Sequence, residues 1–376
     1  MAGFASNDQI INSFTSGKVF KASWSKNMNP TAAAVANEWH TLFRGGGNPP
    51  ADALFNTGTN LVFQPVTDTT TNAATIQHGG NVSPDYKFLV SASVVSAAAT
   101  VVPCTLALVD VLGFYRVTSV TTTTAQSTTN TLTAFSNFTV AVNDILTHTN
   151  INLFPYTRIQ LTTTGTLPTG VTTATDYYVI KLTDTTCKLA TSYANAVAGT
   201  AISITSGTGS GTHTINTLLP RYTCGCGVQA IIFNSNATAL GAATPNLSLG
   251  YTNSSQVGSR ATPTVLPIGK TAASNSHIIY TGATGTGKYN YIVPLQGGDA
   301  GIAKIDTIQN SVSYVSGEYT VALIKEIARY PLSTLGLAAE RNHIFEFPSM
   351  PRIYDGAALY WSVGSGALHK KHTDLS

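Results

Sequence analysis

Residues 104–117 have the sequence CTLALVDVLGFYRV, a nearly unbroken run of apolar side chains. Valine, phenylalanine and tyrosine favour strands, so this run predicts a long β-strand. Seven further runs after residue 50 are rich in Val, Ile, Thr and Tyr and are bounded by Gly, Asn, Asp or Pro. They are NLVFQPV (60–66), DYKFLVSASVV (85–95), VQAIIFN (228–234), HIIYTG (277–282), YNYIVPL (289–295), AKIDTIQNSVSYV (303–315) and EYTVALIKEI (318–327).

The spacing of these runs predicts a mainly β protein with a β-sandwich or jelly-roll body. No regular alternation of strand and helix patterns follows along the chain, which argues against a doubly wound parallel sheet. A chain of 376 residues, of which 43% are hydrophobic, is long enough and apolar enough to bury a core of this kind.

Residues 1–48 differ from the rest of the chain and predict a helical N-terminal arm. SNDQIINSF (6–14) begins with a Ser-Asn cap candidate, so we expect a short helix there. Residues 30–47, PTAAAVANEWHTLFRGGG, predict a second helix that starts at Pro30 and ends at three glycines. The apolar residues at near-helical spacing are Ala34, Val35, Trp39, Leu42 and Phe43. The arm either packs on its own sheet or docks on a neighbouring subunit, and both interpretations remain open.

Residues 131–217 form a Thr-rich block with short strand patterns, which predicts a compact β module. DYYVI (176–180) supplies an aromatic core strand, and LPTG (167–170) a turn. The tripeptide Asn-Thr-Leu occurs at 130–132 and again at 216–218, at the two edges of the block. This arrangement suits an insertion into a surface loop, so the parent body would consist of two pieces, 49–130 and 218–376.

The composition restricts the class of protein. Charged residues make up only 10% of the chain, and small neutral residues replace them, as is typical of virion and cell-surface β-proteins. The net charge is +3, with 20 basic and 17 acidic residues and no basic cluster, which argues against nucleic-acid binding. No apolar run reaches the ~20 residues that span a membrane, so we expect no membrane partner. No signal peptide is visible, so we expect folding in a cytoplasm.

Several stretches of the chain resemble segments of a known group of proteins. Within the module they are LPTG, YYVI (177–180), KLATSYANAVAGT (188–200) and GTGSGTHTI (207–215). In the flanks they are HGGNVSPDYKFLVSAS (78–93), LALVDVLGFY (106–115), LPRYTCGCGVQ (219–229), LGYTNSSQVGSRATPT (249–264) and FPSMPRIYDGAALYW (347–361). With these stretches the module resembles a small β module that recurs in structural proteins of tailed bacteriophages, and the flanks resemble a family of virion proteins of such phages. The resemblance implies a virion component and implies no reaction.

GATGTGKY (282–289) resembles the phosphate-binding loop of nucleotide hydrolases up to its lysine. A helix should follow such a loop, but Tyr289 and the residues after it have the pattern of a strand that ends at Pro294. Tyr289 also stands where a Ser or Thr would bind Mg²⁺. We therefore predict a glycine-rich hairpin between two strands, and no nucleotide cofactor.

Paired carboxylates that could hydrolyse a glycan are not marked by any spacing. Glu326 stands at the end of a predicted strand, Glu340 adjoins Arg341, and Asp355-Gly356 has the pattern of a turn, so solvated ion pairs and turns explain them. We expect no enzyme and no catalytic residue. The acidic residues considered are Asp299, Asp306, Glu318, Glu326, Glu340, Glu346 and Asp355.

Cysteines and histidines do not predict a metal site. Cys224-Gly-Cys226 lacks the ligand spacing of zinc sites, and Cys104 and Cys187 stand alone, so buried free thiols are expected. Of the histidines, only His369 and His372, on the C-terminal tail, are spaced like ligands; the others are His40, His78, His148, His213, His277 and His343. Gly364-Ser365-Gly366 lacks the spacing of a nucleophile elbow and is predicted to be a loop after the strand LYWSV (359–363).

Adjacent tyrosines offer a binding face, because Tyr177 and Tyr178 must point to opposite sides of a strand. Tyr289 and Tyr291 would share one face. Core packing, carbohydrate binding and lattice contact remain open for the outward-facing rings.

These observations together predict a virion structural protein, assembled in the host cytoplasm, that binds the outside of a phage head as a decoration or cement protein. We expect the major capsid protein as its partner, a homotrimer as its oligomeric state, and host or environmental glycans as a further partner of the module. The alternatives are a tail, collar or fibre component that contacts the host, and a depolymerase.

Overall fold

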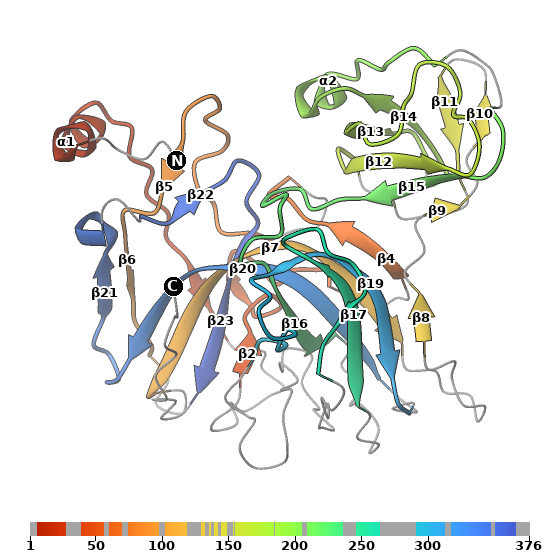
Figure 1. Ribbon diagram of the computed structural model, residues 1–376. Helices are drawn as coiled ribbons and strands as arrows, with labels where there is room; N and C mark the ends of the chain where they lie inside the picture. Colours follow the sequence, from red (N-terminus) through yellow and green to blue (C-terminus); the bar gives the residue numbers. More distant parts are fainter. Residues whose placement is uncertain are drawn as a thin grey trace.

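The computed structural model describes residues 6–27, 39–55, 60–69, 74–97, 102–118, 129–131, 135–136, 139–141, 144–148, 153, 155–183, 185–204, 209–235, 246–263, 291–312, 317–346 and 350–365. This part of the chain is mainly β, with curled antiparallel sheets and few helical residues (Figure 1). None of its helices is long and apolar enough to cross a membrane.

A six-stranded sheet forms the centre of the body, and the run 104–117 lies in its middle. The strand order is β16 (Gln229–Asn234), β20 (Glu318–Leu332), β7 (Cys104–Thr118), β23 (Leu359–Ser365) and β2 (Trp39–Thr41), and β4 (Asn60–Pro65) also pairs with β7. The long strand predicted from CTLALVDVLGFYRV is thus confirmed.

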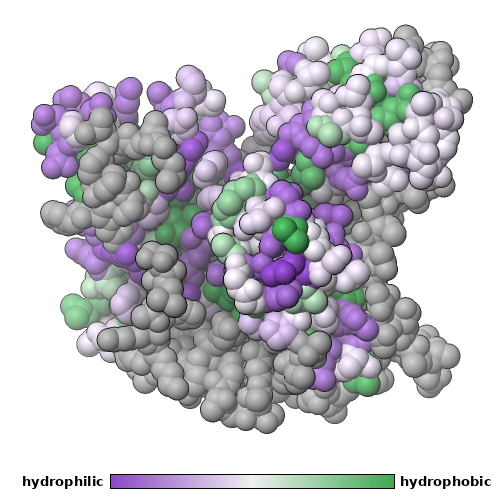
Figure 2. All heavy atoms as spheres, viewed as in Figure 1, coloured by the Kyte–Doolittle hydropathy of each residue, from purple (hydrophilic) through white to green (hydrophobic). Residues whose placement is uncertain are grey.

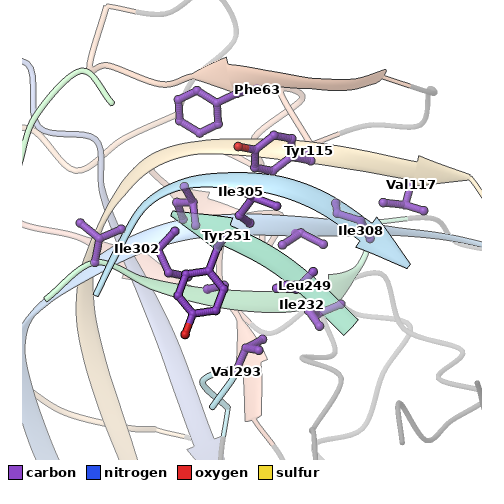
Figure 3. Packing of buried hydrophobic residues seen from close by; sticks show 14 of the residues in the cluster. Phe63, Tyr115, Val117, Ile232, Leu249, Tyr251, Val293, Ile302, Ile305 and Ile308 are labelled. Atoms are coloured by element: carbon purple, nitrogen blue, oxygen red, sulfur yellow. The ribbon is translucent and has the colours of Figure 1, made fainter. Parts of the chain in front are cut away.

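A four-stranded sheet packs against one face of this sheet. Its order is β18 (Arg260–Ala261), β17 (Leu247–Asn253), β19 (Ile302–Asn310) and β8 (Thr129–Thr131). Leu249, Tyr251 and Ile305 from this sheet share a buried core with Tyr115 and Ile232 from the six-stranded sheet (Figure 3). Burial of apolar side chains between the two sheets therefore holds them together.

The opposite face of β7 is equally apolar. Val109, Val111 and Phe114 lie in a second buried cluster with the rings of Phe43 and Phe55. A strand that is buried on both faces has no position for a polar side chain turned to solvent. This explains why the run is continuous in hydrophobicity and does not alternate.

Gly113 marks an irregularity in β7. Its neighbour Leu112 is an extra residue in the ladder, since Leu323 of β20 pairs with Gly113 and Ile324 pairs with Val111. A Cβ atom at Gly113 would lie 2.3 Å from the ring of Phe63 on β4. Only glycine allows β4 to cross β7 this closely.

A seven-stranded sheet lies to one side of the others (Figure 1). Its strands, in spatial order, are β10 (Thr139–Ala141), β11 (Ile145–Thr147), β14 (Thr186–Ala190), β13 (Tyr177–Lys181), β12 (Arg158–Thr163), β15 (His213–Thr217) and β9 (Phe135–Ser136). All seven strands come from the segment predicted as an inserted module, whereas β8, at its start, pairs with β19 of the body. The division into domains stays a prediction.

Short elements complete the described fold. Three two-stranded ribbons pair β1 (Ser25–Lys26) with β3 (Gly47–Asn48), β21 (Ala339–Asn342) with β6 (Ser91–Val94), and β22 (Arg352–Ile353) with β5 (Lys87–Phe88). The helices are α1 (Asn7–Thr15), α2 (Tyr193–Val197) and the 3₁₀ helix η2 (His343–Glu346).

The predicted N-terminal helices have different outcomes. The short helix is confirmed, since α1 begins after Ser6, whose hydroxyl accepts a hydrogen bond from the Gln9 amide at 3.4 Å. The second helix is wrong at its C-terminal end, because Trp39–Thr41 is strand β2; residues 28–38 lie outside the described residues.

Pairing with β23 explains why residues 39–41 are extended. Trp39 lies opposite Gly364, where a Cβ atom would approach the indole ring to 2.5 Å. The prediction of a loop at Gly364–Ser365 is therefore also wrong, because both residues continue β23. Sheet pairing and burial of the indole outweigh the modest helix propensity of this segment.

A buried ion pair joins β7 to the chain that leaves the module. Arg221, in the loop before β16, donates to Asp110 of β7 from Nε at 2.9 Å and from Nη2 at 2.6 Å. The same guanidinium donates to the carbonyls of Val66 and Val111, and Asp110 also accepts from the Ala358 amide. Both side chains are almost fully buried, so each charge depends on these contacts for its solvation.

Replacing Arg221 by methionine should leave the Asp110 carboxylate buried without its counter-charge. We expect the R221M variant to lose ~3–5 kcal/mol of unfolding free energy, measured by urea denaturation. The matched control is K304M, since the Lys304–Asp306 pair is 47% and 31% exposed. Such a surface pair is worth only ~0–1 kcal/mol. Equal stability of the two variants would contradict a supporting role for the buried pair.

Candidate functional site

Residues 18–27, which follow α1, lie against the body and form a segment that we call the strap. The Asn27 amide donates to the Gly46 carbonyl at 2.8 Å, and the ring of Trp24 lies 4.8 Å from that of Trp361. Lys26 donates from Nζ to the carbonyls of Gly45 and Pro50 at 3.1 and 2.9 Å. The strap is therefore held at its C-terminal end by backbone pairing and aromatic contact.

A groove of about 660 Å³ lies between this strap and the body. Its walls come from three segments: the strap, the turn after β3, and the chain before the bridge at Ile76. The lining residues are Phe20, Ala22, Ser23, Asn48, Pro49, Pro50, Ala51, Ala53, Ala74, Thr75, Ile76 and Gln77. None of them is charged, so the groove suits an uncharged ligand or a neutral stretch of polypeptide.

Thr75 is the unusual residue of this groove. The residue is 2% exposed, and its hydroxyl has no hydrogen-bond partner among the described residues. A buried hydroxyl without a partner costs free energy, because it has lost its bonds to water. Thr75 therefore contributes a buried hydroxyl without a partner among the described residues to the wall of the groove.

Asp52 holds in place the chain segments that line the groove. Its carboxylate accepts hydrogen bonds from the amides of Leu54 and Ala74, at 2.7 and 2.9 Å, and from the hydroxyl of Tyr360. Burial raises the pKa of Asp52, and these hydrogen bonds oppose that shift because they favour the ionised form. One carboxylate therefore ties the loop that follows β3 to β23 and to the chain at residue 74.

The acidic residues considered from the sequence are dispersed over the described chain. Glu326 lies inside β20, not at a strand end as predicted, and accepts from Arg329 and from the Tyr291 hydroxyl. Asp355 lies in the predicted turn and accepts from the amides of Val82 and Ser83. Asp306 pairs with Lys304, Glu340 accepts from Ser93, Glu318 begins β20 and Glu346 ends η2.

Asp299 is the most strongly held of these carboxylates. It accepts two hydrogen bonds from Arg260, at 2.9 and 3.0 Å, one from the Tyr251 hydroxyl at 2.6 Å and one from the Asn253 amide at 2.7 Å. Arg260 first, and then Tyr251 and Asn253, hold the pKa of Asp299 well below its usual range. The network connects the loop before β19 to β17 and β18, which is a structural role.

The five histidines that the structure describes do not form a cluster. His40, His148, His213 and His343 are buried in separate places, and His78 lies 3.1 Å from Asp68. Among the described residues no group of three or more His, Cys, Asp or Glu side chains is placed to hold a metal ion. His277, His369 and His372 lie outside the described residues, as does the whole of GATGTGKY with its predicted hairpin.

The cysteine prediction is right for one pair and wrong for the other. Cys104 and Cys187 are buried free thiols, and burial raises the pKa of Cys104 to about 11 and that of Cys187 to about 12. Cys224 and Cys226 are exposed and form a disulfide with each other. The turn at Gly225 brings their Cα atoms to 5.3 Å, within the usual range for such a bond.

The adjacent tyrosines face opposite sides of β13, as predicted. Tyr177 is buried in the core of the seven-stranded sheet, while Tyr178 is half-buried on the other face. Tyr291 stacks on Trp39 with ring centroids 4.1 Å apart, so it is a core residue of the body. Tyr289 lies outside the described residues.

The groove was missed at the sequence level. Asn48-Pro49-Pro50 has the pattern of a break in the chain, and nothing in the local sequence singles out Asp52 or Thr75. The available signal is an aspartate between two alanines directly after a proline pair, which does not distinguish a buried anchor from a solvated turn.

Comparison of the chain with protein-family models, with curated proteins and with solved structures gave no match.

Replacing Thr75 by valine exchanges an unpaired hydroxyl for a methyl group of similar shape. We expect T75V to unfold at an unchanged or higher urea midpoint, because it removes a polar atom without a partner. The matched control is T262V. Thr262 is also 2% exposed, but its hydroxyl accepts from the Leu249 amide at 2.9 Å, and its loss should cost ~1–3 kcal/mol. A similar loss in T75V would mean that the Thr75 hydroxyl is paired.

Replacing Asp299 by asparagine should change how stability depends on pH. Because the folded-state pKa lies below the unfolded value of ~3.9, the carboxylate stabilises the fold above about pH 4. This contribution is lost as the pH falls through the folded pKa. We expect the melting temperature of D299N to lie below that of the wild type at pH 7, measured by thermal unfolding. The difference between the two melting temperatures should decrease steadily as the pH falls towards 2. A gap that does not vary with pH would contradict the ion pair.

Proposed function

We propose that this chain is a structural protein of a tailed-bacteriophage virion and that it binds the outer surface of the head as a decoration or cement protein. The resemblance carried by the module and by the flanking stretches such as LPRYTCGCGVQ supports the class. A partner role of this kind depends on surfaces that bury apolar area and requires no catalytic group.

The architecture supports the proposal at the level of the fold. The core shared by the six-stranded and four-stranded sheets supports a β-sandwich or jelly-roll body. Helix α1 supports a helical part of the N-terminal arm. The module in Figure 2 has a mostly pale surface of intermediate hydropathy, which suits its Thr-rich composition and a face exposed on a particle.

The exposed apolar residues of the arm carry the decoration proposal. Ile11 and Phe14 of α1 are 57% and 45% exposed, and Phe20 of the strap is 57% exposed, while Ile10 is buried. Large apolar side chains grouped on one exposed segment indicate an interaction surface. We infer that the exposed side of α1, defined by Ile11 and Phe14 and called the arm face, docks on the major capsid protein or on a neighbouring copy of this chain.

A homotrimer on the virion is the assembly we propose, because icosahedral lattices offer three-fold sites. The alternative is a tail, collar or fibre component that contacts the host. The outward-facing Tyr178 favours this alternative, because the part of its ring that stays in contact with solvent can bind a surface ligand.

Cryo-electron microscopy of the virion tests the location. We expect density for this chain on the outside of the head, with α1 at the contact with the lattice. Density on the tail and none on the head would contradict the decoration role and support the alternative.

Variants of the arm face test the contact itself. We expect I11S/F14S to bind purified heads at least about tenfold more weakly than the wild type, because the apolar contact is lost. Substitution is preferable to deleting residues 1–48, since the deletion would also remove β2 and β3 from the body. The control is V257S, whose side chain is 51% exposed in the loop between β17 and β18. Unchanged binding by I11S/F14S would exclude the arm face.

A further inference from the structure

One face of the seven-stranded sheet collects polar and aromatic side chains. In the ladders of this sheet Arg158 lies opposite Tyr178, and Gln160 lies opposite Asn216. Directly opposed residues in antiparallel strands project from the same side, and alternate residues of one strand share a side. Arg158, Gln160, Tyr178 and Asn216 therefore share the face opposite the buried core that contains Ile159, Leu161, Tyr177 and Val179.

Three tyrosines form a continuous aromatic edge at this face. The ring of Tyr178 lies 6.4 Å from that of Tyr193, the first residue of α2, and Tyr193 lies 5.8 Å from Tyr156. All three are half-buried, so each ring keeps part of its surface in contact with solvent. Tyr156 precedes β12 and is held in place by its amide, which donates to the Val179 carbonyl at 2.7 Å.

Planar polar groups lie next to this edge and are fixed by one another. The Asp176 carboxylate accepts from Arg158 Nε at 2.8 Å and Nη2 at 2.6 Å, and from the Gln160 amide at 2.9 Å. Asp176 is 37% exposed and Arg158 17%, so the group is rigid yet reachable from solvent. These hydrogen bonds already restrict the carboxylate, the guanidinium and the amide beside the rings. The three groups would therefore lose little conformational entropy when a ligand binds.

We propose that this face, defined by Tyr156, Tyr178, Tyr193, Arg158, Gln160 and Asp176, binds carbohydrate. A pyranose ring has an apolar face of C–H groups and a rim of hydroxyls that both donate and accept hydrogen bonds. Tyrosine offers an apolar ring with a polar tip, so it can cover the C–H face. The carboxylate accepts, the guanidinium donates and the amide does both, which matches the rim.

The chemistry argues for a sugar and against a strongly charged ligand. Arg158 and Asp176 neutralise each other, so this ion pair adds no net charge to the face. The inference does not depend on whether the protein lies on the head or on the tail, because it rests on the module alone.

The proposal predicts binding to an array of printed oligosaccharides of neutral hexoses, N-acetylhexosamines and uronic acids, probed with the full-length protein. We expect at least one class of pyranose to be bound. Titration calorimetry with that oligosaccharide should then show affinity at least about tenfold weaker for Y178A and for Y193A. Absence of binding to every sugar on the array would overturn the proposal.

Matched variants distinguish the loss of a contact with the sugar from unfolding of the protein. Y178F and Y193F keep the rings and should bind within about threefold of the wild type, while D176N should weaken binding without unfolding the protein. Y86A is the control, because Tyr86 is 47% exposed on the body and should leave affinity unchanged. Near-ultraviolet circular dichroism checks that each variant is folded. Equal binding by Y178A, Y193A and the wild type would overturn the proposed site.

Discussion

The ion pair between Arg221 and Asp110 is the contact on which the body of this protein depends. Asp110 lies in a strand that is buried on both faces, so its charge can be compensated only from within the protein. Arg221 supplies that charge from a loop directly after β15, the last strand of the seven-stranded sheet. The same guanidinium binds the Val66 carbonyl, so one side chain joins β7, the chain after β4 and the exit from the module.

The connection between module and body is short and well defined. Arg158 of β12 donates to the Leu219 carbonyl at 3.4 Å, and Leu219 itself is buried in the core between the two body sheets. Two residues later in the chain, the Arg221 side chain binds Asp110 of β7. Among the described residues, the few that follow Thr217 therefore tie the seven-stranded sheet to the body. Helix α1 and the seven-stranded sheet lie apart in Figure 1, so the two proposed contacts would use separate surfaces.

Several errors in the sequence prediction have the same physical origin. Trp39, Leu42 and Phe43 recur at helical spacing. A short apolar pattern, however, does not indicate whether the segment will pair with the edge strand of a sheet formed elsewhere in the chain. Gly364 was taken for a loop glycine, although its missing side chain makes room for the Trp39 ring. Glu326 is predicted at the end of a strand, whereas β20 continues to Leu332 and Glu326 accepts hydrogen bonds from Arg329 and Tyr291.

The amino-acid sequence by itself determined the β character, the central strand 104–117, the capped helix at Asn7–Thr15 and the opposite orientation of Tyr177 and Tyr178. These features depend on side-chain volume, periodicity and caps, which act over a few residues. Only the tertiary structure decided the pairing of Trp39 with Gly364, the Arg221–Asp110 contact, the groove around Thr75 and the cluster of Tyr156, Tyr178 and Tyr193. Each of these joins residues far apart in the chain or on different elements, and local patterns contain no information about which distant partner a side chain will meet.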